Sequence, residues 1–119
     1  MGWAILAPLL VAASATSAPQ TGDYDARLCV SVSAKPASCG PAQAQMMADG
    51  ELRIRVDDIV YHLAFGESQL EGVMLHGSMQ VAEFASPYRW MGNLLQFSDA
   101  PRGLRYEVQL NPKDDAAPR

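Results

Sequence analysis

The sequence predicts a small all-β domain, an antiparallel sandwich or barrel of seven to nine short strands joined mostly by hairpins. Residues 51–65 read ELRIRVDDIVYHLAF, and their apolar and polar side chains alternate on both sides of an Asp-Asp pair, as in a β-hairpin. Turn-forming residues then recur every ~8–12 residues, the spacing of all-β sandwiches and barrels. No long segment carries a helical period.

The hairpin in residues 51–65 has a definite expected register if Asp57 and Asp58 form a two-residue loop. The core face then pairs Val56 with Ile59, Ile54 with Tyr61 and Leu52 with Leu63. The outer face pairs Arg55 with Val60 and Arg53 with His62. Asp-Asp differs from the Asn-Gly pair that such loops prefer, so a four-residue loop stays open.

The next predicted hairpin joins residues 70–75 to residues 78–84 through a turn at His76 and Gly77. This register places Met74 opposite Met79. Apolar residues fall on both faces of the two strands, which differs from the one-sided pattern of a solvated antiparallel sheet. We therefore expect that these strands are covered on both faces or that one face is a contact surface.

The remaining strands are predicted from shorter patterns. Residues 27–33 begin the folded domain, and residues 34–41 read as a loop because they contain Pro36, Gly40 and Pro41. Residues 42–48 fit either a short helix or a strand, and we favour a strand ending at Met47. Gly92 and Asn93 separate two strands at residues 88–91 and 94–97. Residues 104–110 direct Leu104, Tyr106, Val108 and Leu110 inward.

The N-terminus has the pattern of an export signal. Residues 1–15 carry no charged side chain, and an apolar run of about 10–14 residues is too short to span a bilayer. Ala13-Ser14-Ala15 fits the A-x-A cleavage pattern, so we expect cleavage after Ala15, with Ala18 as the alternative. No Lys or Arg precedes the apolar run, which leaves a retained membrane anchor open. The predicted organisation is then a flexible arm (16–26), one β domain (27–110) and a disordered tail (111–119).

Charge and cysteine content narrow the class of protein further. Nine basic residues against thirteen acidic ones give a net charge of −4, and nucleic-acid binding normally needs a basic face. Cys29 and Cys39 are the two cysteines; in an exported chain we expect them to form a disulfide. A bridge over so short a loop contributes about 2–3 kcal/mol in the loop-entropy model.

No motif predicts catalysis, a metal site or a cofactor. The sequence lacks both phosphate-loop patterns and the G-x-S-x-G nucleophile context. Asp57-Asp58 and Asp114-Asp115 are adjacent pairs in a turn and in the tail, and they do not define a glycosidase groove. His62 and His76 are the two histidines, fewer than the three or four ligands of a zinc site.

The best candidate for a binding surface is the contiguous run Tyr88, Arg89 and Trp90, because these residue types are enriched at binding hot spots. Strand alternation favours the opposite interpretation, in which Tyr88 and Trp90 point into the core and only Arg89 points outward. The other candidate surface residues are Met74, Met79, Arg53 and His62.

Three hypotheses of function remain. The first is an exported, non-catalytic binding, inhibitor or envelope accessory protein, whose partner is another envelope or secreted protein or a second copy of itself. The second is a carrier of a small apolar ligand, which needs a cavity of ~300 Å³ or more. The third is a metal-dependent or hydrolytic enzyme, which needs the two histidines close together or beside carboxylates. We favour the first and expect no nucleic acid partner and no membrane span in the mature chain.

Overall fold

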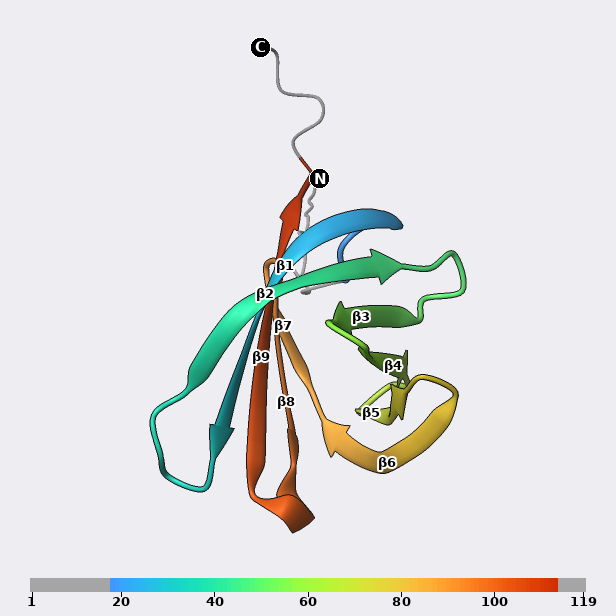
Figure 1. Cartoon of the computed structure of the whole chain (residues 1–119). Coiled ribbons are helices and arrows are strands. Elements are labelled where there is room, and N and C mark those ends of the chain that lie inside the picture. Colours follow the sequence, from blue (N-terminus) through green and yellow to red (C-terminus); the bar gives the residue numbers. More distant parts are fainter. Residues whose placement is uncertain (1–17, 114–119) are drawn as a thin grey trace, which may run out of the picture.

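All nine strands belong to one antiparallel sheet, in the order β6-β5-β4-β3-β2-β1-β9-β8-β7. A computed structural model describes residues 18–113. The sheet curls into a nearly closed barrel (Figure 1), so the predicted all-β, hairpin-connected class is confirmed. The predicted signal segment (1–15) and residues 114–119 of the predicted tail lie outside the described residues.

The strands run in chain order with one short 3₁₀ helix, η1. They are β1 (Gly22–Val32), β2 (Ser38–Met46), β3 (Leu52–Val56), β4 (Ile59–Phe65), β5 (Gln69–His76), β6 (Met79–Pro87), β7 (Arg89–Met91), β8 (Leu94–Asp99), η1 (Ala100–Arg102) and β9 (Leu104–Pro112).

Several predicted boundaries were wrong. Strand β1 begins at Gly22, so the predicted arm over residues 16–26 ends earlier, and strand β9 continues to Pro112, two residues into the predicted tail. Strand β2 begins at Ser38, inside the predicted loop, because Ser38 pairs with Val30 of β1 and the residues after Ser38 continue this antiparallel pairing. The ambiguous segment 42–48 is a strand, as favoured, and it ends at Met46.

The hairpin of β3 and β4 has the predicted two-residue loop and register. Val56 pairs with Ile59 and Arg53 pairs with His62. Asp57 adopts a positive φ of 56°, a conformation that Asp tolerates better than most residues. The alternation of residues 51–65 therefore determined the register of this hairpin without help from the rest of the chain.

The turn between β5 and β6 was predicted one residue too early. His76 pairs with Met79, so Gly77 and Ser78 form the turn, and Gly77 has a φ of 65°. The register also shifts by one residue between Met74 and Leu75, which is a β-bulge. The predicted pairing of Met74 with Met79 is replaced by Met74 with Ala82.

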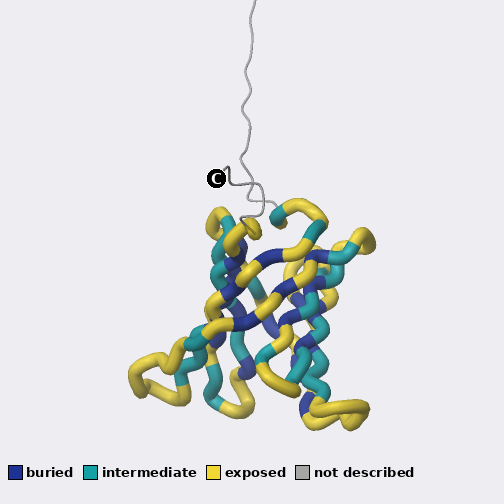
Figure 2. The backbone as a smooth tube through the Cα atoms, turned by 45° about the horizontal axis from the view of Figure 1, so that its top comes forward, coloured by how far each residue is buried: buried dark blue, intermediate teal, exposed yellow. Residues whose placement is uncertain are grey.

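Buried and exposed residues alternate along most strands (Figure 2). The core-facing side chains that are fully buried include Leu52, Ile54, Leu63, Leu70, Leu95, Val108 and Leu110. Four aromatic rings from β4, β6, β8 and β9 pack inside the barrel. Their shortest contact is the stacked pair Phe97 and Tyr106, whose ring centroids lie 4.7 Å apart. The interior is thus packed with aliphatic and aromatic side chains.

Two contacts hold the strands in the barrel: the pairing of β1 with β9 in the middle of the sheet, and a contact from β6 to β8 that brings its two ends together. Strand β1 pairs with β9 from Tyr24 opposite Pro112 to Val32 opposite Leu104. On the other side, the buried Ser86 of β6 meets β8: the backbone N–H of Ser98 donates to its Oγ at 2.9 Å. The disulfide between Cys29 and Cys39 links directly opposite residues of β1 and β2. Across residues 18–113, no helix is long and apolar enough to cross a membrane.

Replacing Gly72 by alanine tests the packing of the barrel interior. A Cβ at this position would overlap the ring of Phe84, its cross-strand neighbour. We expect Gly72→Ala to lower the free energy of unfolding by about 1–3 kcal/mol, the usual cost of overpacking a core. Chemical denaturation measures this change.

Gly40→Ala is the matched control, because Gly40 also lies in a strand and a Cβ there meets no atom within 4 Å. Equal stability of the two variants would contradict the description of the packing around Phe84.

Candidate functional site

The outer face of the sheet carries two hollows. The first, here called the basic groove, has a volume of about 580 Å³ and crosses β1 to β5. Its lining includes Asp23, Gln43, Gln45, Arg53, Arg55, Val60, His62, Leu75 and Lys113. The second groove, of about 570 Å³, lies on β1, β7, β8 and β9 and includes Tyr88, Arg89, Gln96, Arg105 and Glu107.

Strand register arranges the side chains of the basic groove in two rows across the sheet. One row runs Asp23, Gln45, Arg53, His62 and Val73 from β1 to β5. The other row runs Asp25, Gln43, Arg55, Val60 and Leu75. Each row therefore changes from acidic through amide and cationic to apolar, and the two arginines stand side by side on β3.

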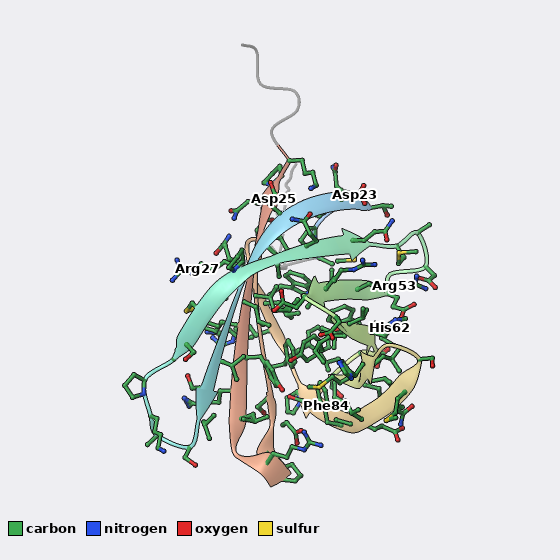
Figure 3. The ribbon with its side chains drawn as sticks, viewed as in Figure 1. Asp23, Asp25, Arg27, Arg53, His62 and Phe84 are labelled. Carbon is green, nitrogen blue, oxygen red and sulfur yellow. A yellow bond between two sulfur atoms is a disulfide. The ribbon has the colours of Figure 1, made fainter. Side chains whose placement is uncertain are left out.

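Arg53 and His62 lie on neighbouring strands (Figure 3) and share one carboxylate. Oε2 of Glu51 is 3.0 Å from Nδ1 of His62, while its Oε1 is 3.7 Å from Nη2 of Arg53. Nε of Arg53 is buried and has no hydrogen-bond partner within residues 18–113. A buried donor without a partner costs about 1–3 kcal/mol, so the hydrogen-bonding capacity of Arg53 is poorly used.

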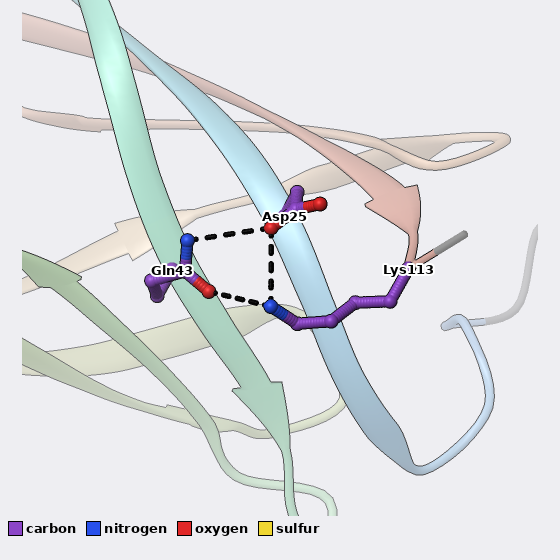
Figure 4. A network of polar contacts seen from close by, with 3 residues as sticks. All are labelled: Asp25, Gln43 and Lys113. Carbon is purple, nitrogen blue, oxygen red and sulfur yellow. Dashed lines mark hydrogen bonds and ion pairs between the residues drawn. The ribbon is translucent and has the colours of Figure 1, made fainter. Parts of the chain in front are cut away.

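At the β1 end of the groove, Lys113 is held by two side chains (Figure 4). Its Nζ donates to Oδ1 of Asp25 at 3.1 Å and to Oε1 of Gln43 at 2.8 Å. The hydrogen bond from Lys113 is the largest of the interactions that lower the pKa of Asp25 below its ordinary value of 3.8. Lys113 is therefore neutralised locally, unlike Arg55, which has no ion-pair partner in the described part of the chain.

Apolar side chains continue the outer face beyond the groove. Val60, Val73 and Leu75 are half-buried on β4 and β5. On β6, Val81 is 42% exposed, and Met79, at the end of the strand, is 65% exposed. The predicted two-sided apolar character of β5 and β6 is thus present, and no other part of the described chain covers Val81 and Met79.

The structure brings together only part of the predicted surface. Arg53 and His62 lie in the basic groove, whereas Arg89 is exposed in the second groove. Trp90 is 5% exposed and belongs to the core, so its assignment to the predicted binding surface was wrong.

The other predicted surface residues are scattered. Tyr88 packs its ring against Phe65 and donates from its hydroxyl to the carbonyl of Gly66 at 2.6 Å. Met74 packs against the core, and Met79 stands at the exposed end of β6. These three residues therefore do not form one surface with Arg53 and His62.

Apart from Arg53 and His62, the residues that line the groove were not predicted as site residues, and three of them matter most: Arg55, Leu75 and Lys113. Arg55 could have been found, because it lies two residues from Arg53 and alternation places it on the same face. Leu75 was assigned to an apolar face but not to a site with the arginines. Lys113 reaches the groove only because β9 pairs with β1, and the local sequence contains no signal for that pairing.

The two histidines contact different carboxylates. His62 contacts Glu51, and Nε2 of His76 lies 2.8 Å from Oδ2 of Asp58. The contact with His76 lowers the pKa of Asp58. Residues 18–113 contain no group of three or more potential metal ligands.

The titratable side chains buried in the barrel include Tyr61, Tyr106 and Asp99. Burial raises the pKa of Tyr61 and raises that of Tyr106 further. Their rings meet edge to face, with centroids 5.7 Å apart. Neither tyrosine lines the basic groove, whereas Tyr106 also lines the second groove.

Comparison with known proteins finds no matching family model, no similar curated protein and no similar solved structure.

Removing the charge of Lys113 tests the network at the β1 end of the groove. In Lys113→Gln we expect the pKa of Asp25 to rise toward 3.8, because the main interaction that lowers it is lost. A carboxyl ¹³C NMR titration measures this pKa directly. Since the folded-state pKa is lowered, ionised Asp25 favours folding above its unfolded-state pKa, and this contribution disappears as pH falls through the folded-state value.

Lys35→Gln is the control, because Lys35 lies in an exposed turn and makes no side-chain contact with Asp25. An unchanged pKa of Asp25 in Lys113→Gln, or an equal rise in the control, would contradict the network.

Proposed function

We propose that this protein is an exported, non-catalytic binding domain whose ligand is another protein of the cell envelope or the exterior. The observation that carries the proposal is the outer face of β3 to β6, where half-exposed apolar side chains adjoin the two arginines of the basic groove. Val81 on β6 and Leu75 on β5 form the apolar part, and Arg53 and Arg55 on β3 form the basic part.

Apolar side chains exposed on a sheet that faces water are unfavourable in free energy. The outer faces of antiparallel sheets are normally polar, and apolar patches that adjoin polar groups mark interaction sites. Arginine is also one of the residue types enriched at binding hot spots. Because these residues stand on paired strands, their backbone is ordered before a partner arrives, which reduces the entropy lost on binding.

Two further features support an exported location. The apolar N-terminal segment followed by Ala13-Ser14-Ala15 fits a signal peptide, and the Cys29–Cys39 disulfide is a bond that persists in oxidising compartments.

Site-specific photo-crosslinking tests the proposal. We expect a photoreactive phenylalanine analogue at Val81 to link the protein to one partner in intact source cells or their medium, because Val81 is exposed beside the groove. The same analogue at Arg105, exposed on β9 within the second groove, serves as the control position. Gel electrophoresis and mass spectrometry identify the adducts.

The proposal predicts a single protein adduct from Val81 and none from Arg105. Adducts of equal yield from both positions, or no adduct from Val81, would contradict it. An adduct that contains two copies of this chain would replace the proposed partner with a homo-oligomer.

A further inference from the structure

The basic groove has cationic donors that the described protein does not use. Arg55 is exposed and has no ion-pair partner among residues 18–113. The Arg53 side chain is 43% exposed, and its one ion-pair contact, from Nη2 to Glu51, is long at 3.7 Å. Since a guanidinium carries five N–H donors in a fork that matches a carboxylate, the pair is poised for an anionic ligand.

The spacing of the two arginines suits a small anion. They occupy alternate positions of β3 on the same face, so their Cα atoms are separated by about 6.5–7 Å. Two guanidinium groups at that separation can converge on one carboxylate. On the neighbouring strand Val60 stands directly opposite Arg55, and Leu75 of β5 stands opposite Val60. A carboxylate bound at the arginines would therefore lie beside an apolar surface.

Acidic residues limit the charge of the ligand. The row through Arg53 ends at Asp23 on β1 and, past Val73, at Glu83 on β6. Asp25 ends the other row, where it already contacts Lys113. A polyanion such as a nucleic acid would extend over these carboxylates and be repelled, whereas a single carboxylate would not reach them.

We propose that the basic groove binds a peptide segment of the partner that carries one carboxylate next to an apolar side chain. Arg53 and Arg55 donate to the carboxylate, and Val60 with Leu75 contacts the neighbouring apolar side chain. This inference rests on the proposed binding function and names the chemistry of the segment recognised. The carboxylate can belong to an Asp or Glu side chain or to the C-terminus of the partner.

Titration of ¹⁵N-labelled protein with three synthetic peptides tests this inference. The first is acetyl-Ser-Leu-Glu-Val-Ser-amide, the second has Gln in place of Glu, and the third is the Gln peptide with a free C-terminal carboxylate. We expect at least one of the two peptides that carry a carboxylate to shift the amide signals of β3 and β4 and to bind at least about tenfold more tightly than the amidated Gln peptide, as for other charge-assisted pairs.

Arginine substitutions assign the effect to the groove. In Arg53→Gln/Arg55→Gln the Glu and amidated Gln peptides should bind alike, whereas Arg105→Gln, in the second groove, should keep the difference. Tight binding of the free-carboxylate peptide alone identifies a C-terminus as the source, and tight binding of the Glu peptide alone identifies a side chain. No binding of any peptide, equal binding of all three, or an unchanged preference in the double variant would overturn the inference.

The chain's own acidic residues provide a competing occupant, because Asp114 and Asp115 follow Lys113 of the groove directly in sequence. A chain ending at Lys113 should bind the Glu peptide with the affinity of the full chain. A gain of tenfold or more on truncation would assign the groove to residues 114–119 and overturn the inference. If crosslinking from Val81 succeeds while the peptide titration fails, the binding function stands and only the carboxylate site is lost.

Discussion

The pairing of β1 with β9 holds the barrel together, and the basic groove depends on it as well. Seven of the eight strand pairings in the described sheet join strands that are consecutive in the chain; each of them can form locally. Only β1 and β9 join distant parts of the sequence, from Tyr24 opposite Pro112 to Val32 opposite Leu104. Forming this pairing costs the conformational entropy of closing a loop that contains most of the chain. The same pairing places Lys113 beside Asp25 at the end of the groove.

The local parts of the fold could be predicted from the sequence, and the non-local parts could not. The hairpin of β3 and β4 was predicted in register because alternation together with the favoured two-residue loop specifies which residues pair. The turn of β5 and β6 was misplaced because a bulge at Met74 and Leu75 breaks the alternation on which register prediction depends. The start of β2 was missed because Gly40 and Pro41 usually end strands, whereas here their pairing with β1 keeps the strand extended.

In the candidate site, too, local features could be predicted from the sequence and non-local features could not. The sequence placed Arg53 opposite His62, and the strand register confirmed this pair. It did not predict a groove, because the hollow arises from the curvature of five adjacent strands and not from any one of them. The hot-spot composition of residues 88–90 drew attention to Trp90, but strand alternation, which places that ring in the core, was the better guide. Composition identifies candidate residues, and only the register decides which side of the sheet they face.

In the proposed mode of binding, the two arginines of β3 recognise a carboxylate on the outer face of the barrel. A crystal structure of the protein with a peptide that contains one glutamate between apolar residues tests it most directly. We expect the carboxylate oxygens within hydrogen-bond distance of the guanidinium groups of Arg53 and Arg55, with an apolar peptide side chain against Val60 and Leu75. A peptide carboxylate bound in the groove of Arg89 and Arg105, or one pointing into solvent away from β3, would contradict it.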